Sequence, residues 1–154
     1  MFRTISDFVS EITGGRRHPT AFADGDYRLA AAALLVHVAT LDQDFDDEER
    51  TKIKETLVDR FELKREEAEL LVAAAVDADR KAVDLYHFTS VLNHALDDDG
   101  RKRIIEMMFE VAFVDGKLSE FEDNVVWRAS ELLNVSPRDR VELRRRVRDE
   151  SEGS

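Results

Sequence analysis

The sequence predicts an all-α fold, a compact bundle of about seven to eight helices from two pseudo-symmetric helix–acidic turn–helix repeats. Three observations predict it. The 154 residues include only two prolines and six glycines, so few residues interrupt helices. Residues 27–41 and 101–114 are long apolar stretches, which predict helices buried within a bundle. The segment 34–49 also resembles the segment 107–122, as a duplicated unit would.

Residues 1–25 are expected to form a short N-terminal helix followed by a linker. The helix would carry one apolar stripe, made of Phe2, Ile5, Phe8, Val9 and Ile12. This pattern predicts a helix docked on the core. A helix lying on a membrane surface would carry several basic residues on its polar face, and this one has only Arg3.

Residues 26–148 are expected to form the single main domain, which is long enough to bury a core without disulfides or metals. Pro137, directly after Ser136, marks the start of the last helix. Residues 149–154 are expected to be a disordered tail. Within the domain, helices are expected over residues 26–41, 51–61, 64–79, 84–95, 101–114, 125–133 and 137–148.

The internal repeat relates the two buried stretches and the acidic turns that follow them. The alignment sets LLVHVATLDQDFDDEE beside MMFEVAFVDGKLSEFE, with Asp42 opposite Asp115 and Glu49 opposite Glu122. Further along the chain, the register shifts by one residue. Neither unit can cover its apolar surface alone, so packing them face to face would bring the two turns into pseudo-symmetric positions.

The charge of the chain limits its partners. The net charge is −11, and six of the eight residues 42–49 are acidic. This charge repels nucleic acid and anionic lipid, and it attracts divalent cations and basic protein surfaces. No transmembrane segment is expected, because no apolar run approaches the necessary length of about 18 residues. The absence of cysteine rules out disulfides and thiol catalysis and fits a cytoplasmic location, while the oligomeric state stays open.

The acids of the turns have both structural and functional explanations. Glu122 is three residues after Ser119, the spacing of a capping box, and Glu49 stands in the same relation to Asp46. The acids that end the buried helices, at positions 42 and 115, oppose the helix dipole at a cost of about 0.3–1 kcal/mol. Either an Asx-turn or a bound cation would offset this cost.

A divalent cation such as Ca²⁺ or Mg²⁺ requires several hard oxygen ligands. The candidate metal ligands are Asp42, Asp44, Asp46, Glu49, Asp115 and Glu122. The first turn is not an EF-hand, because Asp47 replaces the glycine at position six and Ile53 replaces the glutamate at position twelve. Ligands would therefore have to come from both turns.

No enzyme motif is present in the sequence. It contains no HExxH, no GxSxG and no glycine-rich phosphate loop. His37 is interpreted as a core histidine on a buried helix. The arginines at 144–146 and 148 suit the dipole at the end of the last helix, and a basic strip for an acidic partner is the alternative.

The repeat resembles the turns of the TerB-like (tellurite resistance TerB) domain family, which includes the N-terminal region of DjlA-type co-chaperones. The segments that carry the resemblance are VATLD at 38–42, FDDEE at 45–49 and VAFVDGKLSEFE at 111–122, and it extends over residues 26–148. The first turn departs from the pattern, since Gln43 stands where the second turn has glycine.

The resemblance implies a bundle of two pseudo-symmetric halves, no catalysis, and a role in tellurite or chemical stress responses, often in bacteria. It also implies a divalent cation held by Asp42, Glu49, Asp115 and Glu122. The leading hypothesis is thus a non-enzymatic binding domain with a cation or basic partner at paired acidic turns. The alternatives are a scaffold or protein-interaction domain without metal, and a carboxylate-based metal hydrolase. Tellurite is an anion, so any stress role should be indirect.

Overall fold

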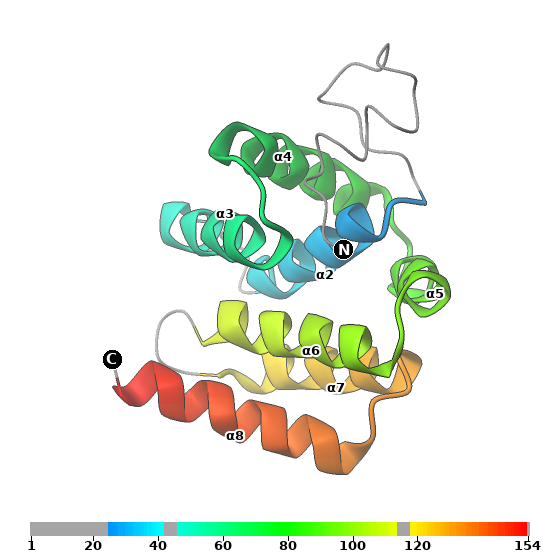
Figure 1. Ribbon diagram of the computed structural model, residues 1–154, viewed down its shortest axis with the longest axis vertical. Coiled ribbons are helices and arrows are strands. Elements are labelled where there is room, and N and C mark those ends of the chain that lie inside the picture. The colour runs from blue at the N-terminus through cyan, green and yellow to red at the C-terminus, as the bar shows by residue number, and fades with distance from the viewer. Residues whose placement is uncertain (1–24, 42–45, 114–117, 154) are drawn as a thin grey trace.

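The computed structural model describes residues 25–41, 46–113 and 118–153. Over these residues the chain forms seven helices and no strand, which confirms the all-α class and the compact helical bundle (Figure 1). The expected N-terminal helix lies outside the described residues. The helices are α2 (Tyr27–Ala39), α3 (Asp47–Phe61), α4 (Arg65–Lys81), α5 (Tyr86–Ala95), α6 (Asp98–Ala112), α7 (Glu120–Leu132) and α8 (Pro137–Gly153).

Helix α2 is the central helix of the bundle, as its composition predicts. It contacts α3, α4, α5, α6 and α7. In Figure 1 it lies between α4 above and α6 below. Ala31, Ala32 and Ala33 are completely buried. The spacing between packed helices depends on the side chains at the contact, so these alanines allow close neighbours on several sides.

Helix α6 is the second buried helix, and it joins the two halves of the chain. It contacts α2 and α3 on one side and α7 and α8 on the other. Ile105, Met108 and Phe109 are fully buried. Its first turn is exposed and begins at Asp97, whose carboxylate accepts a hydrogen bond of 2.9 Å from the Gly100 amide. Helix α6 is therefore buried over its second half rather than along its whole length.

The internal repeat is visible in the helix boundaries. Helices α2 and α6 end at equivalent alanines, and α3 and α7 begin after equivalent caps, Asp46 and Ser119. After the one-residue shift, α3 and α7 are followed by equivalent left-handed residues, Glu62 with φ 55° and Asn134 with φ 62°. Among the described helices, α5 has no counterpart, and it connects two sets of three helices. A pseudo-symmetric packing of these sets stays a prediction.

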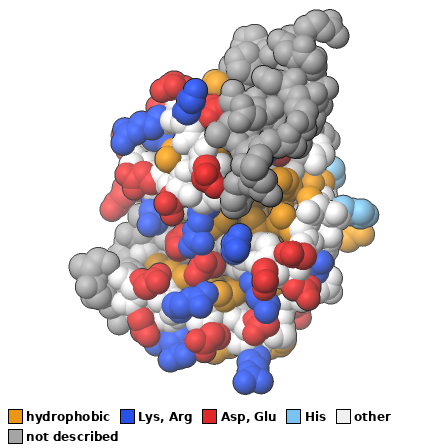
Figure 2. All heavy atoms as spheres, viewed as in Figure 1, with side chains coloured by type: hydrophobic (Ala, Val, Ile, Leu, Met, Phe, Trp, Pro, Cys, Tyr) orange, Lys and Arg blue, Asp and Glu red, His pale blue; other side chains and the backbone are white. Residues whose placement is uncertain are grey.

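A network of ion pairs ties the two halves together. Arg60 of α3 contacts Glu106 at 3.0 Å and also pairs with Glu110, both on α6. Arg146 of α8 contacts the other oxygen of Glu106 at 3.0 Å. Burial alone would lower the pKa of Arg60, but the hydrogen bonds and charges of the two glutamates outweigh it and raise that pKa. Charged side chains of both signs are interspersed over the face of the molecule that Figure 2 shows.

Helix α8 is longer than the sequence analysis expected. It runs to Gly153, through residues for which a disordered tail was expected. The reason is that no proline or glycine follows Pro137 before Gly153, so the sequence contains no stop signal at Arg148. Leu143 and Val147 are buried and fix the helix against the rest of the bundle.

Candidate functional site at the acidic turns

Three of the six predicted metal ligands belong to the described part of the chain: Asp46, Glu49 and Glu122. The other three, Asp42, Asp44 and Asp115, lie outside the described residues. Their role as ligands stays a prediction. The site is therefore built from the helix ends on either side of the two turns.

The first turn leads into a capping box at the start of α3. The Asp46 carboxylate accepts a hydrogen bond of 2.8 Å from the amide of Glu49, and the Glu49 carboxylate accepts one of 3.3 Å from the amide of Asp46. Asp46 is exposed and Glu49 is half-buried. Each acid thus satisfies an amide that a helix start leaves without an intrahelical partner.

The second turn leads into an equivalent capping box at the start of α7. The Ser119 hydroxyl accepts a hydrogen bond of 3.1 Å from the amide of Glu122, and the Glu122 carboxylate accepts one of 2.9 Å from the amide of Ser119. Glu122 is buried, with 6% of its surface exposed. The structural explanation of Glu49 and Glu122 is thus confirmed, and it leaves the ligand hypothesis untested.

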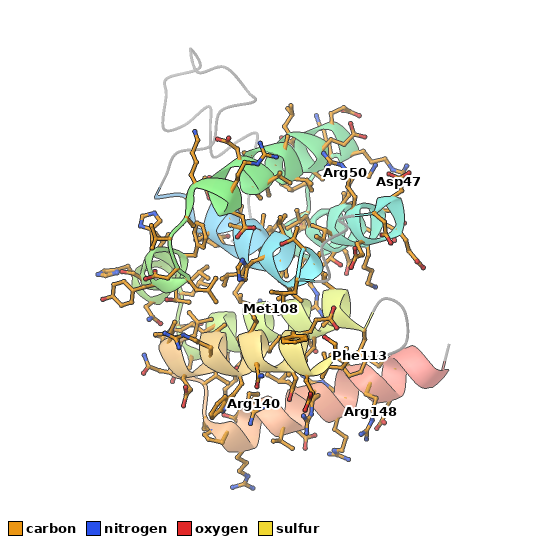
Figure 3. All side chains as sticks on the ribbon, turned by 180° about the vertical axis from the view of Figure 1, so that it is seen from behind. Asp47, Arg50, Met108, Phe113, Arg140 and Arg148 are labelled. Atoms are coloured by element: carbon orange, nitrogen blue, oxygen red, sulfur yellow. The ribbon has the colours of Figure 1, made fainter. Side chains whose placement is uncertain are left out.

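The two turns border the same end of the molecule. The last turns of α2 and α6 and the first turns of α3 and α7 all lie on the left in Figure 1. In the reverse view, Asp47 of α3 and Phe113 after α6 both lie on the right (Figure 3). Helices α2 and α6 are also in contact. The topology thus brings the helix ends that flank the two acid-rich segments to one end of the bundle.

The described residues do not by themselves form a complete metal site. Within residues 25–41, 46–113 and 118–153, no group of three or more His, Asp or Glu side chains is placed to hold a metal ion. A cation at this end of the bundle would therefore need Asp42, Asp44 or Asp115 as well. The geometry of the described residues by itself supports two capping boxes, one at the start of α3 and one at the start of α7.

His37 is less buried than its interpretation as a core histidine implies. Its side chain is 34% exposed, and its Nδ1 atom lies 2.9 Å from a carboxylate oxygen of Asp79. This contact joins α2 to α4. The difference arises because α2 reaches the surface along one narrow strip near its C-terminal end, where a polar ring can face both water and a neighbouring helix.

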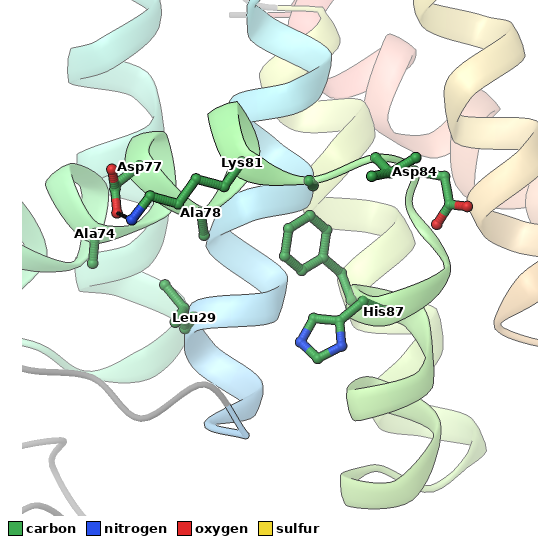
Figure 4. A pocket seen from close by; sticks show the side chains of 10 residues that line it. Leu29, Ala74, Asp77, Ala78, Lys81, Asp84 and His87 are labelled. Carbon is green, nitrogen blue, oxygen red and sulfur yellow. Dashed lines mark ion pairs between the residues drawn. The ribbon is translucent and has the colours of Figure 1, made fainter.

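The sequence analysis missed a groove beside α4 and α5. The groove is lined by Val83, which is 99% exposed, and by charged side chains such as Asp77 and Lys81 (Figure 4). The signal that could have found it is Val83, a large apolar residue in the short connection between α4 and α5, where polar turn residues are usual.

Residues 28–145, from the start of α2 into α8, match the family model described as tellurite resistance protein TerB. The chain belongs to the TerB family. The match confirms the resemblance drawn from the repeat, and the matched region contains both capping boxes of this TerB-family chain. Comparison with curated proteins and with solved structures gives no match. Among the described residues of this TerB domain, no helix has the length and apolar character needed to cross a membrane.

Proposed function

We propose that this TerB domain is a non-enzymatic binding domain that holds a divalent cation, Ca²⁺ or Mg²⁺, at its two acidic turns. The observation that carries the proposal is the pair of equivalent capping boxes at one end of the bundle. Each box holds a glutamate, Glu49 or Glu122, at the helix start that directly follows an acid-rich turn.

The energetic argument concerns the acids that precede each box. Asp42 and Asp115 follow the ends of α2 and α6 in the sequence, where a negative charge opposes the helix dipole. Asp44 and Asp46 add further negative charge to the first turn. A divalent cation would offset this repulsion and is the ligand that clustered carboxylates favour. The proposal assigns the ligands to both turns, with the two capping glutamates held in place by their amide contacts.

Within this proposal the domain acts in a stress response by binding rather than by catalysis. The TerB family is generally non-enzymatic. The description of its family model is tellurite resistance protein TerB. A chain with net charge −11 repels the tellurite anion, so the role would be indirect, in the cytoplasm of a bacterium. The acidic surface would bind a cation or a basic protein surface.

A second candidate is a protein-interaction domain without metal. The observation that favours it is the exposure of two aromatic side chains on α7, Phe121 at 71% and Trp127 at 44%. Aromatic residues are enriched at protein interfaces. A carboxylate-based hydrolase is less well supported, since it would also need an open metal position beside a substrate pocket.

The test is calorimetric titration of the metal-stripped protein with Ca²⁺ and with Mg²⁺. Glu122→Gln is the most informative variant, because glutamine also serves in a capping box but is a far weaker cation ligand. The proposal expects this variant to keep the stability of the metal-free protein and to lose cation binding. Asp42→Asn and Asp115→Asn are expected to lose binding as well.

The matched control is Asp99→Asn in the first turn of α6. Asp99 is exposed and lies outside both turns, and its removal changes the net charge by the same amount. Binding that survives in this control and disappears in the turn variants supports a specific site. Equal weakening in all four variants would mean diffuse attraction to an acidic surface, and no heat at millimolar cation would mean that the acids only cap helices.

A further inference from the structure

A pocket of about 90 Å³ opens between the start of α2, the end of α3 and the first half of α6. We call it the α3–α6 pocket. Its walls are apolar and include Phe61, Ile104 and Met107, all of which are buried. Tyr27 packs edge-to-face against Phe61, with ring centroids 5.9 Å apart, and this contact fixes one wall. Hydrophobic side chains are visible in the middle of the face that Figure 2 shows, which in Figure 1 lies between the end of α3 and α6.

Two guanidinium groups border this apolar pocket, those of Arg60 and Arg103. Arg60 is already paired with Glu106 and Glu110. Arg103 is exposed, and among the described residues it has no ion pair, hydrogen bond or aromatic contact. An unpaired guanidinium beside an apolar recess suits an apolar side chain that has a carboxylate next to it.

The size of the pocket limits its occupant to one side chain. Sites for small-molecule ligands usually measure about 300–1,000 Å³, and a cavity of about 150 Å³ holds a benzene ring. The α3–α6 pocket, with about 90 Å³, can take one aromatic or branched side chain inserted partway. Anchor side chains of protein interfaces fill pockets of this kind. The occupant is therefore a side chain of a protein rather than a whole small molecule.

The chain itself carries a side chain with these properties. Phe121, at the start of α7, is 71% exposed, and the neighbouring Glu120 is exposed as well. Glu120 forms no ion pair within the part of the chain that the structure describes. The capping box of Ser119 and Glu122 fixes the backbone on both sides of Phe121. Because this backbone is already ordered, inserting the ring into a pocket would cost little conformational freedom.

Phe121 cannot reach the pocket of its own chain. The pocket is bordered by α2, α3 and α6, whereas α7 packs against α6 from the other side. We propose that Phe121 of one copy inserts into the α3–α6 pocket of a second copy, where Glu120 pairs with Arg103. Each copy carries both parts of this contact, so the contact either repeats from copy to copy or closes reciprocally into a dimer.

The net charge of the chain opposes this contact at a distance but not at close range. Two copies of net charge −11 repel each other, but at physiological salt exposed charges more than about 8 Å apart are largely screened. Within the contact, the carboxylate of Glu120 faces the guanidinium of Arg103. One aromatic anchor and one exposed ion pair make a weak interface, with an expected dissociation constant of about 1 mM.

The test is NMR of the ¹⁵N-labelled full chain, recorded from dilute to about millimolar protein. A chelator is present, so that no cation links the copies and the result is independent of the proposed cation site. The amides of Phe121 and Ile104 should shift with concentration, and sedimentation equilibrium should show a rising mass. Phe121→Ser should abolish both effects. The matched control is Tyr86→Ser, since Tyr86 is an aromatic residue of similar exposure, 65%, on α5, and it should change neither.

Charge reversal separates the proposed contact from general repulsion. Arg103→Glu and Glu120→Arg should each weaken the association about tenfold, because each places like charges opposite each other. The double variant restores both the pair and the net charge, so it should regain the association. Glu120→Arg is the sharpest case: it makes the net charge less negative, and general repulsion alone would predict stronger association.

The positions changed in these variants are all exposed, so the variants should fold, and their amide spectra show this directly. A wild type that stays monomeric at millimolar concentration would overturn the proposal. So would association that survives Phe121→Ser, an equal loss in Tyr86→Ser, or a double charge variant that stays monomeric.

Discussion

Replacement of Arg60 by methionine should cost about 2–3 kcal/mol of unfolding free energy. Exposed ion pairs contribute about 0.2–1 kcal/mol, and breaking a fully buried pair costs about 3–5 kcal/mol. The expected value lies between these ranges because the side chains of the network are mostly but not fully buried. The side chains of Arg60, Glu106 and Glu110 are 25%, 14% and 21% exposed. Methionine keeps an unbranched apolar stem and the helix propensity of the arginine, and it removes the guanidinium group. It leaves two glutamates one helical turn apart on α6, and Arg146 contacts one of them, Glu106.

Urea unfolding followed by circular dichroism measures this loss, and it also reports whether the m-value stays unchanged. In a domain of this size, the melting temperature should fall by about 4–12 °C. Lys54→Met is the control, since Lys54 pairs with Glu69 at 3.3 Å but Glu69 is 62% exposed. A double-mutant cycle with Glu110→Gln isolates the coupling. If Arg60→Met costs no more than Lys54→Met, the network does not hold the two halves together and the reasoning is refuted.

Three further predictions concern helix ends and one exposed carboxylate. Ser119→Ala should lower the unfolding free energy by about 1 kcal/mol, measured by urea unfolding, because α7 loses its cap. Glu62→Gly should raise it by about 0.5–1 kcal/mol in the same assay, since the left-handed φ of 55° strains glutamate but not glycine. The hydrogen bond and charge of Arg145 lower the pKa of Glu142. The contribution of this carboxylate to the stability of the folded state is present above the ordinary pKa of glutamate and is lost as pH falls through the lowered pKa. An NMR titration should show the pKa of Glu142 rising in Arg145→Gln.

The parts of the fold that could be predicted are those that local sequence determines. The Ser119-x-x-Glu122 spacing predicts a capping box because both partners lie within one helical turn, and the box is present. The apolar residues of α2 predict a central helix because no face of it could remain in water. The correspondence between the ends of α3 and α7 follows from the repeat, including the one-residue shift.

The parts that could not be predicted depend on which helices become neighbours. Helical spacing shows that α5 has an apolar face, but not that its start leaves a groove against α4. The contact of His37 with Asp79 joins residues 42 positions apart, so no local pattern contains it. Of the candidate site, the capping roles of Glu49 and Glu122 followed from spacing, whereas convergence of the two turns on one cation depends on tertiary packing and stays a prediction.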